Sequence, residues 1–139
     1  MSTKPNQKFT LSSSDLAQHV QETRIRTLEL VDDLSDEQLV LPKIDTVNPV
    51  TWELGHVAFF YDVFLLQNLE TDEFLLDGAE NLYDSFKIDH EDRWDLPLPS
   101  RKETLNYMQR VLDRVVGRLD SHKPSARETY LYLLTVLHE

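Results

Sequence analysis

Histidine is the residue type best suited to metal chemistry in this sequence, which contains no cysteine. Thiolate metal sites, disulfides and cysteine nucleophiles are therefore excluded, and a metal site must use histidine, aspartate or glutamate. Two of the five histidines fall on apolar helical faces: His56 shares a face with Trp52 and Phe60, and His138 shares one with Leu134. Facing imidazoles inside a helical bundle are one way in which metal sites are built. His56 and His138 are therefore the candidate metal ligands.

Both histidines also have a structural interpretation, because a single histidine on an apolar face is more often a hydrogen-bonded core residue than a ligand. Two imidazoles alone rarely make a firm site, so a third ligand is needed. Glu53, three residues before His56, could pair with it at the surface or could hydrogen-bond to it and orient it as a metal ligand. The surface pair is favoured. His138 and Glu139 begin an H-E-x-x-H pattern whose second histidine is not present. Three histidines have polar neighbours and are expected at the surface: His19, His90 and His122.

Arg93 and Trp94 lie in an irregular stretch and form a second candidate site. An arginine beside a tryptophan could bind an anionic small molecule. In the structural alternative Arg93 pairs with Asp92 or Asp95 and Trp94 closes the core, and both interpretations stay open. Other reaction classes lack their motifs, since the chain has no G-x-S-x-G, no G-x-G-x-x-G and no P-loop.

Composition limits the possible partners of this 139-residue chain. It carries 25 acidic and 14 basic residues, a formal net charge of −11, which argues against nucleic acid and anionic membranes as partners. No stretch of about 18 apolar residues is present, and the N-terminus lacks the apolar region of a signal peptide. Because 40% of the residues are hydrophobic, we expect one soluble, cytoplasmic domain with a buried core.

Helices must position these residues, because glycine is scarce and proline falls mostly between periodic segments. We predict an all-α fold, a four-helix bundle. The helices are expected to begin near Ser13, at Asn48–Pro49, at Ser100 and at Ser125, with Asn48 as a cap and capping boxes at the last two. The first should end near residue 34 and the second near residue 69. Residues 70–99 predict an irregular crossover between the second and third long helices, in which Phe74–Phe86 is partly helical or rich in turns.

The last predicted helix reaches the end of the sequence without a stop signal. No Gly, Asn or Pro follows it, and no Lys or Arg lies in its last turn. We therefore expect residues 13–139 to be a helical domain that is cut within its fourth helix, with a natural product that continues beyond Glu139. A frayed natural terminus is the alternative. Residues 1–12 are expected to be a flexible N-terminal segment.

Three stretches of the sequence resemble a known family. The segment from Asn48 to Phe60, NPVTWELGHVAFF, is similar to the W-x-x-G-H helix of DinB-like domains. More narrowly, it resembles the N-terminal domain of the ergothioneine-biosynthesis sulfoxide synthases, including the selenoneine synthase branch. The runs at 82–86 and 93–100, LYDSF and RWDLPLPS, and the terminal Leu137-His138-Glu139 also look like this group.

The resemblance implies a function and a ligand set. Enzymes of this family use Fe(II) and O2 to join a small-molecule thiol or a selenium donor to a histidine betaine. Three histidines hold the iron; His56 and His138 match two of them, and the third would fall four residues after His138. Arg93 is the nearest match to the arginines that bind the carboxylates of the thiol substrate. The family also has a C-terminal domain resembling formylglycine-generating enzyme, so this chain alone is expected to be inactive, and Zn or Ni could replace iron.

Two rival functions remain open. The first is another DinB-like enzyme, a metal-dependent thiol transferase or hydrolase that uses the same histidines without O2 and without a second domain. The second is a non-catalytic helical docking module, in which the histidines are packed in the core and bind no metal.

Overall fold

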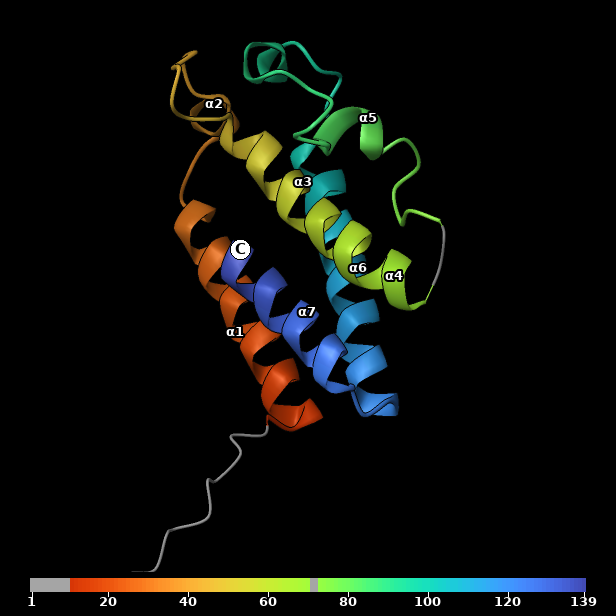
Figure 1. Ribbon diagram of the computed structural model, residues 1–139. Helices are drawn as coiled ribbons and strands as arrows, with labels where there is room; N and C mark the ends of the chain where they lie inside the picture. The colour runs from red at the N-terminus through yellow and green to blue at the C-terminus, as the bar shows by residue number, and fades with distance from the viewer. Residues whose placement is uncertain (1–10, 71–72) are drawn as a thin grey trace, which may run out of the picture.

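The computed structural model describes residues 11–70 and 73–139, and these residues form a helical bundle (Figure 1). The all-α prediction is confirmed, since the described residues contain no strand and only one isolated β-bridge, between Ile44 and Val47. The elements in chain order are α1 (Ser13–Val31), α2 (Asp36–Val40), α3 (Val50–Tyr61), the π-helical turn η1 (Asp62–Leu66), α4 (Gln67–Leu69), α5 (Glu80–Tyr83), the 3-10 turn η2 (His90–Trp94), α6 (Arg101–Ser121) and α7 (Ala126–His138).

The long helices pack side by side. Helix α6 lies against both α3 and α1, and α7 lies against α1, α3 and η1. Figure 1 shows the C-terminal end of α7 between α1 and α3, while α2, α5 and η2 gather at the end of the bundle where α3 begins. The last turn of α7 is therefore held between two helices that come from the first half of the chain.

Serine side chains begin the long helices, as the sequence predicts. Ser12 and Ser100 form capping boxes with Asp15 and Glu103, and Ser125 accepts a hydrogen bond from the backbone N–H of Glu128. Each side chain satisfies a backbone N–H that the helix itself leaves free. At Ser125 the box is only half made, because the Glu128 carboxylate lies 3.8 Å from Arg118 instead.

Two predicted helix ends are wrong. Helix α1 stops at Val31 rather than near residue 34, because Ser35 caps the short helix α2, which was not predicted from the sequence. Asn48 makes no helix-capping hydrogen bond, and Pro49 occupies the cap position of α3. The predicted second helix is otherwise confirmed as one continuous run, α3–η1–α4, that ends at Leu69.

The crossover is ordered by contacts with α3 and η1. Trp52 Nε1 donates to the carbonyl of Leu82 at 2.7 Å, and the backbone N–H of Leu75 donates to the buried carboxylate of Asp62 at 2.9 Å. Within the predicted stretch Phe74–Phe86 the structure has turns and the single-turn helix α5, as expected. The predicted N-terminal segment, residues 1–12, lies outside the described residues except for its last two. None of the described helices is long and apolar enough to span a membrane.

Gly55 is the point at which the crossover touches α3 most closely. A methyl group added at Gly55 would overlap the ring of Tyr83, which is fully buried. A methyl group added at Gly117 of α6 would meet open space.

We predict that Gly55→Ala lowers the free energy of unfolding by about 3 kcal/mol, the upper end of overpacking costs, because the Tyr83 ring must be displaced. Gly117→Ala is the matched control and should raise it by about 0.5–1 kcal/mol, since alanine loses less backbone entropy within a helix. Urea unfolding of the two variants measures both changes. Equal effects of the two substitutions would contradict the close packing at Gly55.

Candidate metal centre

His56 is held in one orientation on α3. Its side chain is almost fully buried, its ring stacks on that of Trp52 with centroids 4.5 Å apart, and its Nδ1 lies 2.8 Å from the backbone carbonyl oxygen of Tyr83. A carbonyl oxygen can only accept a hydrogen bond, so Nδ1 carries the proton. In the neutral ring Nε2 is then left with a free lone pair, the form in which an imidazole binds a metal.

His138 lies in the last turn of α7. Its ring stacks on Phe60 of α3, with centroids 3.6 Å apart, and the residue as a whole is exposed. Partial burial, and then the neighbouring His56, lower the pKa of His138 below its ordinary value. A lowered pKa keeps the imidazole neutral around pH 7, which leaves it able to bind a metal.

The structure brings the two predicted ligands together. Nε2 of His138 lies 3.3 Å from Nε2 of His56, although the residues are 82 positions apart in the chain. Two imidazole nitrogens that each lie about 2.0–2.1 Å from one metal ion would be roughly 3.0–3.4 Å apart. The pair therefore has the spacing of two adjacent ligands. Over residues 11–70 and 73–139 there is no cluster of three His, Asp or Glu side chains suited to a metal.

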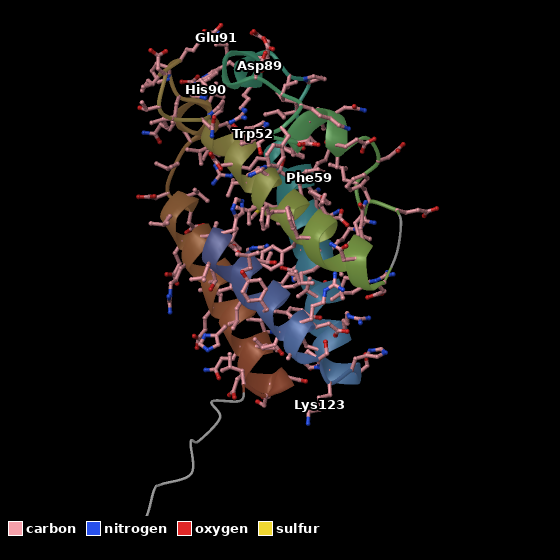
Figure 2. All side chains as sticks on the ribbon, viewed as in Figure 1. Trp52, Phe59, Asp89, His90, Glu91 and Lys123 are labelled. Atoms are coloured by element: carbon pink, nitrogen blue, oxygen red, sulfur yellow. The ribbon has the colours of Figure 1, made fainter. Side chains whose placement is uncertain are left out.

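A cavity of about 450 Å³ opens beside the histidine pair. Its walls are mainly aromatic, and Glu80, Asp84 and Lys87 add charged groups. The lining side chains come from α3, η1, the crossover and the end of α7: His56, Phe59, Phe60, Val63, Phe64, Phe74, Glu80, Asp84, Ser85, Phe86, Lys87 and His138. Figure 2 shows Trp52 and Phe59 on the same helix, α3, with Phe59 further from its start. A small molecule in this cavity would lie against both imidazoles.

Arg93 does not line this cavity and packs over the ring of Trp52 instead. Its guanidinium group is centred 4.1 Å from the Trp52 ring, and it donates to Asn48 Oδ1 at 2.8 Å and to the carbonyl of Ile88 at 3.1 Å. The sequence alternative in which Arg93 pairs with Asp92 or Asp95 is wrong, because carbonyl and amide oxygens take that place. Trp94 is half-buried, and its Nε1 donates to the carbonyl of Leu41.

The remaining histidines and Glu53 occupy other places. His19 and His122 are exposed, as predicted. His90 is not: it is half-buried, with Nδ1 2.9 Å from Asn48 Oδ1 and Nε2 2.8 Å from the carbonyl of Ile44. Figure 2 shows His90 in the crossover, beyond the start of α3. Glu53 does not pair with His56, because it accepts a hydrogen bond from the Asn48 amide.

A buried ion pair that was not predicted from the sequence adjoins the centre. Arg24 of α1 is 2% exposed, and its Nε donates to Oε1 of Glu139 at 2.9 Å. A signal was present: Arg24 continues the row Leu16–Val20 at a spacing of four residues, so it falls on the buried face of its helix. An arginine on such a face requires a buried partner, which could have directed attention to the far end of the chain.

Fold and site together define a helical-bundle protein with two facing histidines from neighbouring helices. The sequence matches the DinB superfamily over residues 19–136, and the protein belongs to that superfamily. It is also similar to hercynine oxygenase of Mycobacterium tuberculosis, with 28% identity over 130 residues, 92% of this chain and 30% of the relative. Hercynine oxygenase of Mycolicibacterium thermoresistibile is 29% identical over 128 residues, 91% of this chain and 28% of the relative. The chain thus spans less than a third of the length of these curated relatives.

We predict that Arg93→Lys lowers the free energy of unfolding by roughly 1–3 kcal/mol, because lysine cannot make the forked hydrogen bonds of a guanidinium group or cover the Trp52 ring as well. Urea unfolding, followed by tryptophan fluorescence, measures the loss. Arg26→Lys at an exposed position of α1 is the control and should change nothing measurable. Equal stability of both variants would leave Arg93 without a positioning role in the crossover.

Proposed function

We propose that this chain is the DinB-like domain of an iron-dependent enzyme that forms a carbon–sulfur or carbon–selenium bond on a histidine betaine with O2. The observation that carries the proposal is the pair of facing Nε2 atoms of His56 and His138, 3.3 Å apart, in the lining of an aromatic cavity. The relatives' name, hercynine oxygenase, supports a histidine betaine as substrate and O2 as co-substrate.

The donor set of the pair fits a divalent transition metal. Neutral imidazoles suit iron, nickel and zinc alike, so the ligands themselves leave Zn or Ni as substitutes for Fe(II). When bound, iron(II) would supply the redox chemistry that couples consumption of O2 to formation of the new bond. His56 and His138 would supply two ligands, and the third would come from outside the described residues.

The chain's own residues would also shape the substrate site. The cavity offers aromatic walls for the imidazole ring of a betaine, and the carboxylates of Glu80 and Asp84 give a cationic ammonium group a favourable electrostatic environment. Arg93 is proposed to contact the carboxylate of the thiol or selenium donor, and this role requires that part of its guanidinium group turn away from the crossover. Burial in the cavity would keep water from the reacting groups.

A further domain is proposed to complete the active site. Phe86, on the rim of the cavity, is 95% exposed, and Leu137, beside His138, is 82% exposed. Exposed apolar side chains around a cavity are typical of a surface that another domain covers. We propose a C-terminal domain resembling formylglycine-generating enzyme in this place, and without it we expect no turnover.

Metal binding to the 139-residue chain tests the proposal. Under anaerobic conditions, Fe(II) or Co(II) should bind with a stoichiometry of one, and both His56→Ala and His138→Ala should weaken binding by about tenfold or more, because each removes one of two ligands. His19→Ala and His122→Ala are matched controls and should bind as the unmodified chain does. Isothermal titration calorimetry measures all five proteins.

The outcomes separate the rival functions. Metal binding that is unchanged in His56→Ala and His138→Ala, or no binding at millimolar metal, would contradict the proposal and favour a docking module. Thiol transfer or hydrolysis by the metal-loaded chain without O2 and without a further domain would favour the DinB-like transferase or hydrolase.

A further inference from the structure

The ion pair between Arg24 and Glu139 lies inside the bundle. The side chain of Arg24 is 3% exposed and that of Glu139 is fully buried, and Arg24 Nε donates to Glu139 Oε1 at 2.9 Å. Among the ion pairs of the described residues it is the most deeply buried; the others join partly exposed side chains. Burying two charges costs much free energy unless further hydrogen bonds satisfy them.

Those hydrogen bonds tie the pair to the other helices. Thr27 of α1 donates to Glu139 Oε1 at 3.0 Å, and Arg24 Nη1 donates to the carbonyl of Met108 in α6 at 2.7 Å. Burial, and then the charge of Glu139, raise the pKa of Tyr61 in α3, so its hydroxyl stays protonated. The Tyr61 hydroxyl and Glu139 Oε2 are both buried and have no other partner, so a hydrogen bond between them would satisfy both.

The ion pair and the two histidines lie on opposite sides of the contact between α3 and the end of α7. Phe60 and Tyr61 are successive residues of α3, and His138 and Glu139 are successive residues at the end of α7. Phe60 stacks on His138 at the cavity, whereas Tyr61 lies beside Glu139 and Arg24 in the core. Successive side chains of a helix point about 100° apart, so a fixed Glu139 also fixes the direction of His138.

We propose that the Arg24–Glu139 ion pair is a positioning device that sets the rotation of the last turn of α7 and thereby directs His138 towards His56. Arg24 and Glu139 are positioning residues, because neither touches the cavity. A charged pair is suited to this role: an apolar contact would hold α7 equally well but would tolerate a rotation of the helix, whereas the hydrogen bonds of the pair do not. This inference rests on the proposed role of the two histidines as metal ligands.

The test replaces both charges at once. Arg24→Met with Glu139→Leu removes the pair but leaves an apolar core of similar volume, a change that folded proteins often tolerate. The matched control, Arg118→Met with Glu128→Leu, removes the ion pair at the other end of α7. Circular dichroism first establishes that both double variants are helical and unfold cooperatively.

Two measurements follow. Zn(II) affinity, from competition with a chromogenic chelator, should fall about tenfold or more in Arg24→Met with Glu139→Leu and stay within twofold in the control, and adding His138→Ala should cause little further loss. In the metal-free protein, the nuclear Overhauser effects between the rings of His138 and Phe60 should disappear in the first variant and persist in the control.

Each result decides the matter. Unchanged Zn(II) affinity and persistent ring contacts in the folded double variant would overturn the positioning role. If the unmodified chain binds no metal through its histidines, the proposed function fails, but the ring contacts in the metal-free variants still test the positioning role. If that double variant does not fold, Arg24→Leu with Glu139→Met is a second apolar replacement of similar volume that likewise removes the hydrogen bonds of the pair. It should lose the ring contacts if the ion pair positions His138 and keep them if it does not.

Discussion

The site depends on the packing of Tyr83 against α3. Its ring lies against Gly55, where an added methyl group would overlap it, and its carbonyl oxygen accepts a hydrogen bond from Nδ1 of His56, the next residue on the helix. One residue of the crossover therefore fixes both the distance between crossover and helix and the tautomer of the candidate ligand. The W-x-x-G-H spacing follows from this arrangement: Trp52 stacks on His56 one turn away and anchors the crossover through Leu82, and the glycine admits the tyrosine.

The contact between α3 and the end of α7 has two different sides. On the outer side, His138 stacks on Phe60, and the two imidazoles face each other in the lining of the cavity. On the inner side, a buried ion pair joins α1 to the same turn of α7. Burying charged groups in the core costs free energy, and one of them, Glu139, is the residue next to His138. This arrangement suits a binding site, because the residues that hold α7 in place differ from the residues that are proposed to bind the metal.

The sequence predicts the fold well where signals are local. Capping serines at positions 12, 100 and 125 and apolar periodicity depend on neighbours within a few residues, and they locate three helix starts. The histidine pair was also within reach, since both residues lie on apolar faces, although its spacing of 3.3 Å was not. Long-range partners were out of reach. The neighbours of Asn48 predict a helix cap, but Arg93 and His90, more than 40 residues away, bind its side chain. The ion pair between Arg24 and Glu139 joins residues that are 115 positions apart.

The proposed function requires that the Nε2 atoms of His56 and His138 together bind one metal ion. The most direct measurement is a two-bond proton–nitrogen NMR spectrum of the 139-residue chain, with its histidines labelled with nitrogen-15, before and after addition of one equivalent of Zn(II). We predict that Nε2 of both residues moves to the chemical shift of a metal-bound nitrogen, that Nδ1 of His56 keeps its proton, and that the shifts of His19 and His122 are unchanged. Metal-bound shifts at other histidines, or at Nδ1 of His56, would contradict this prediction.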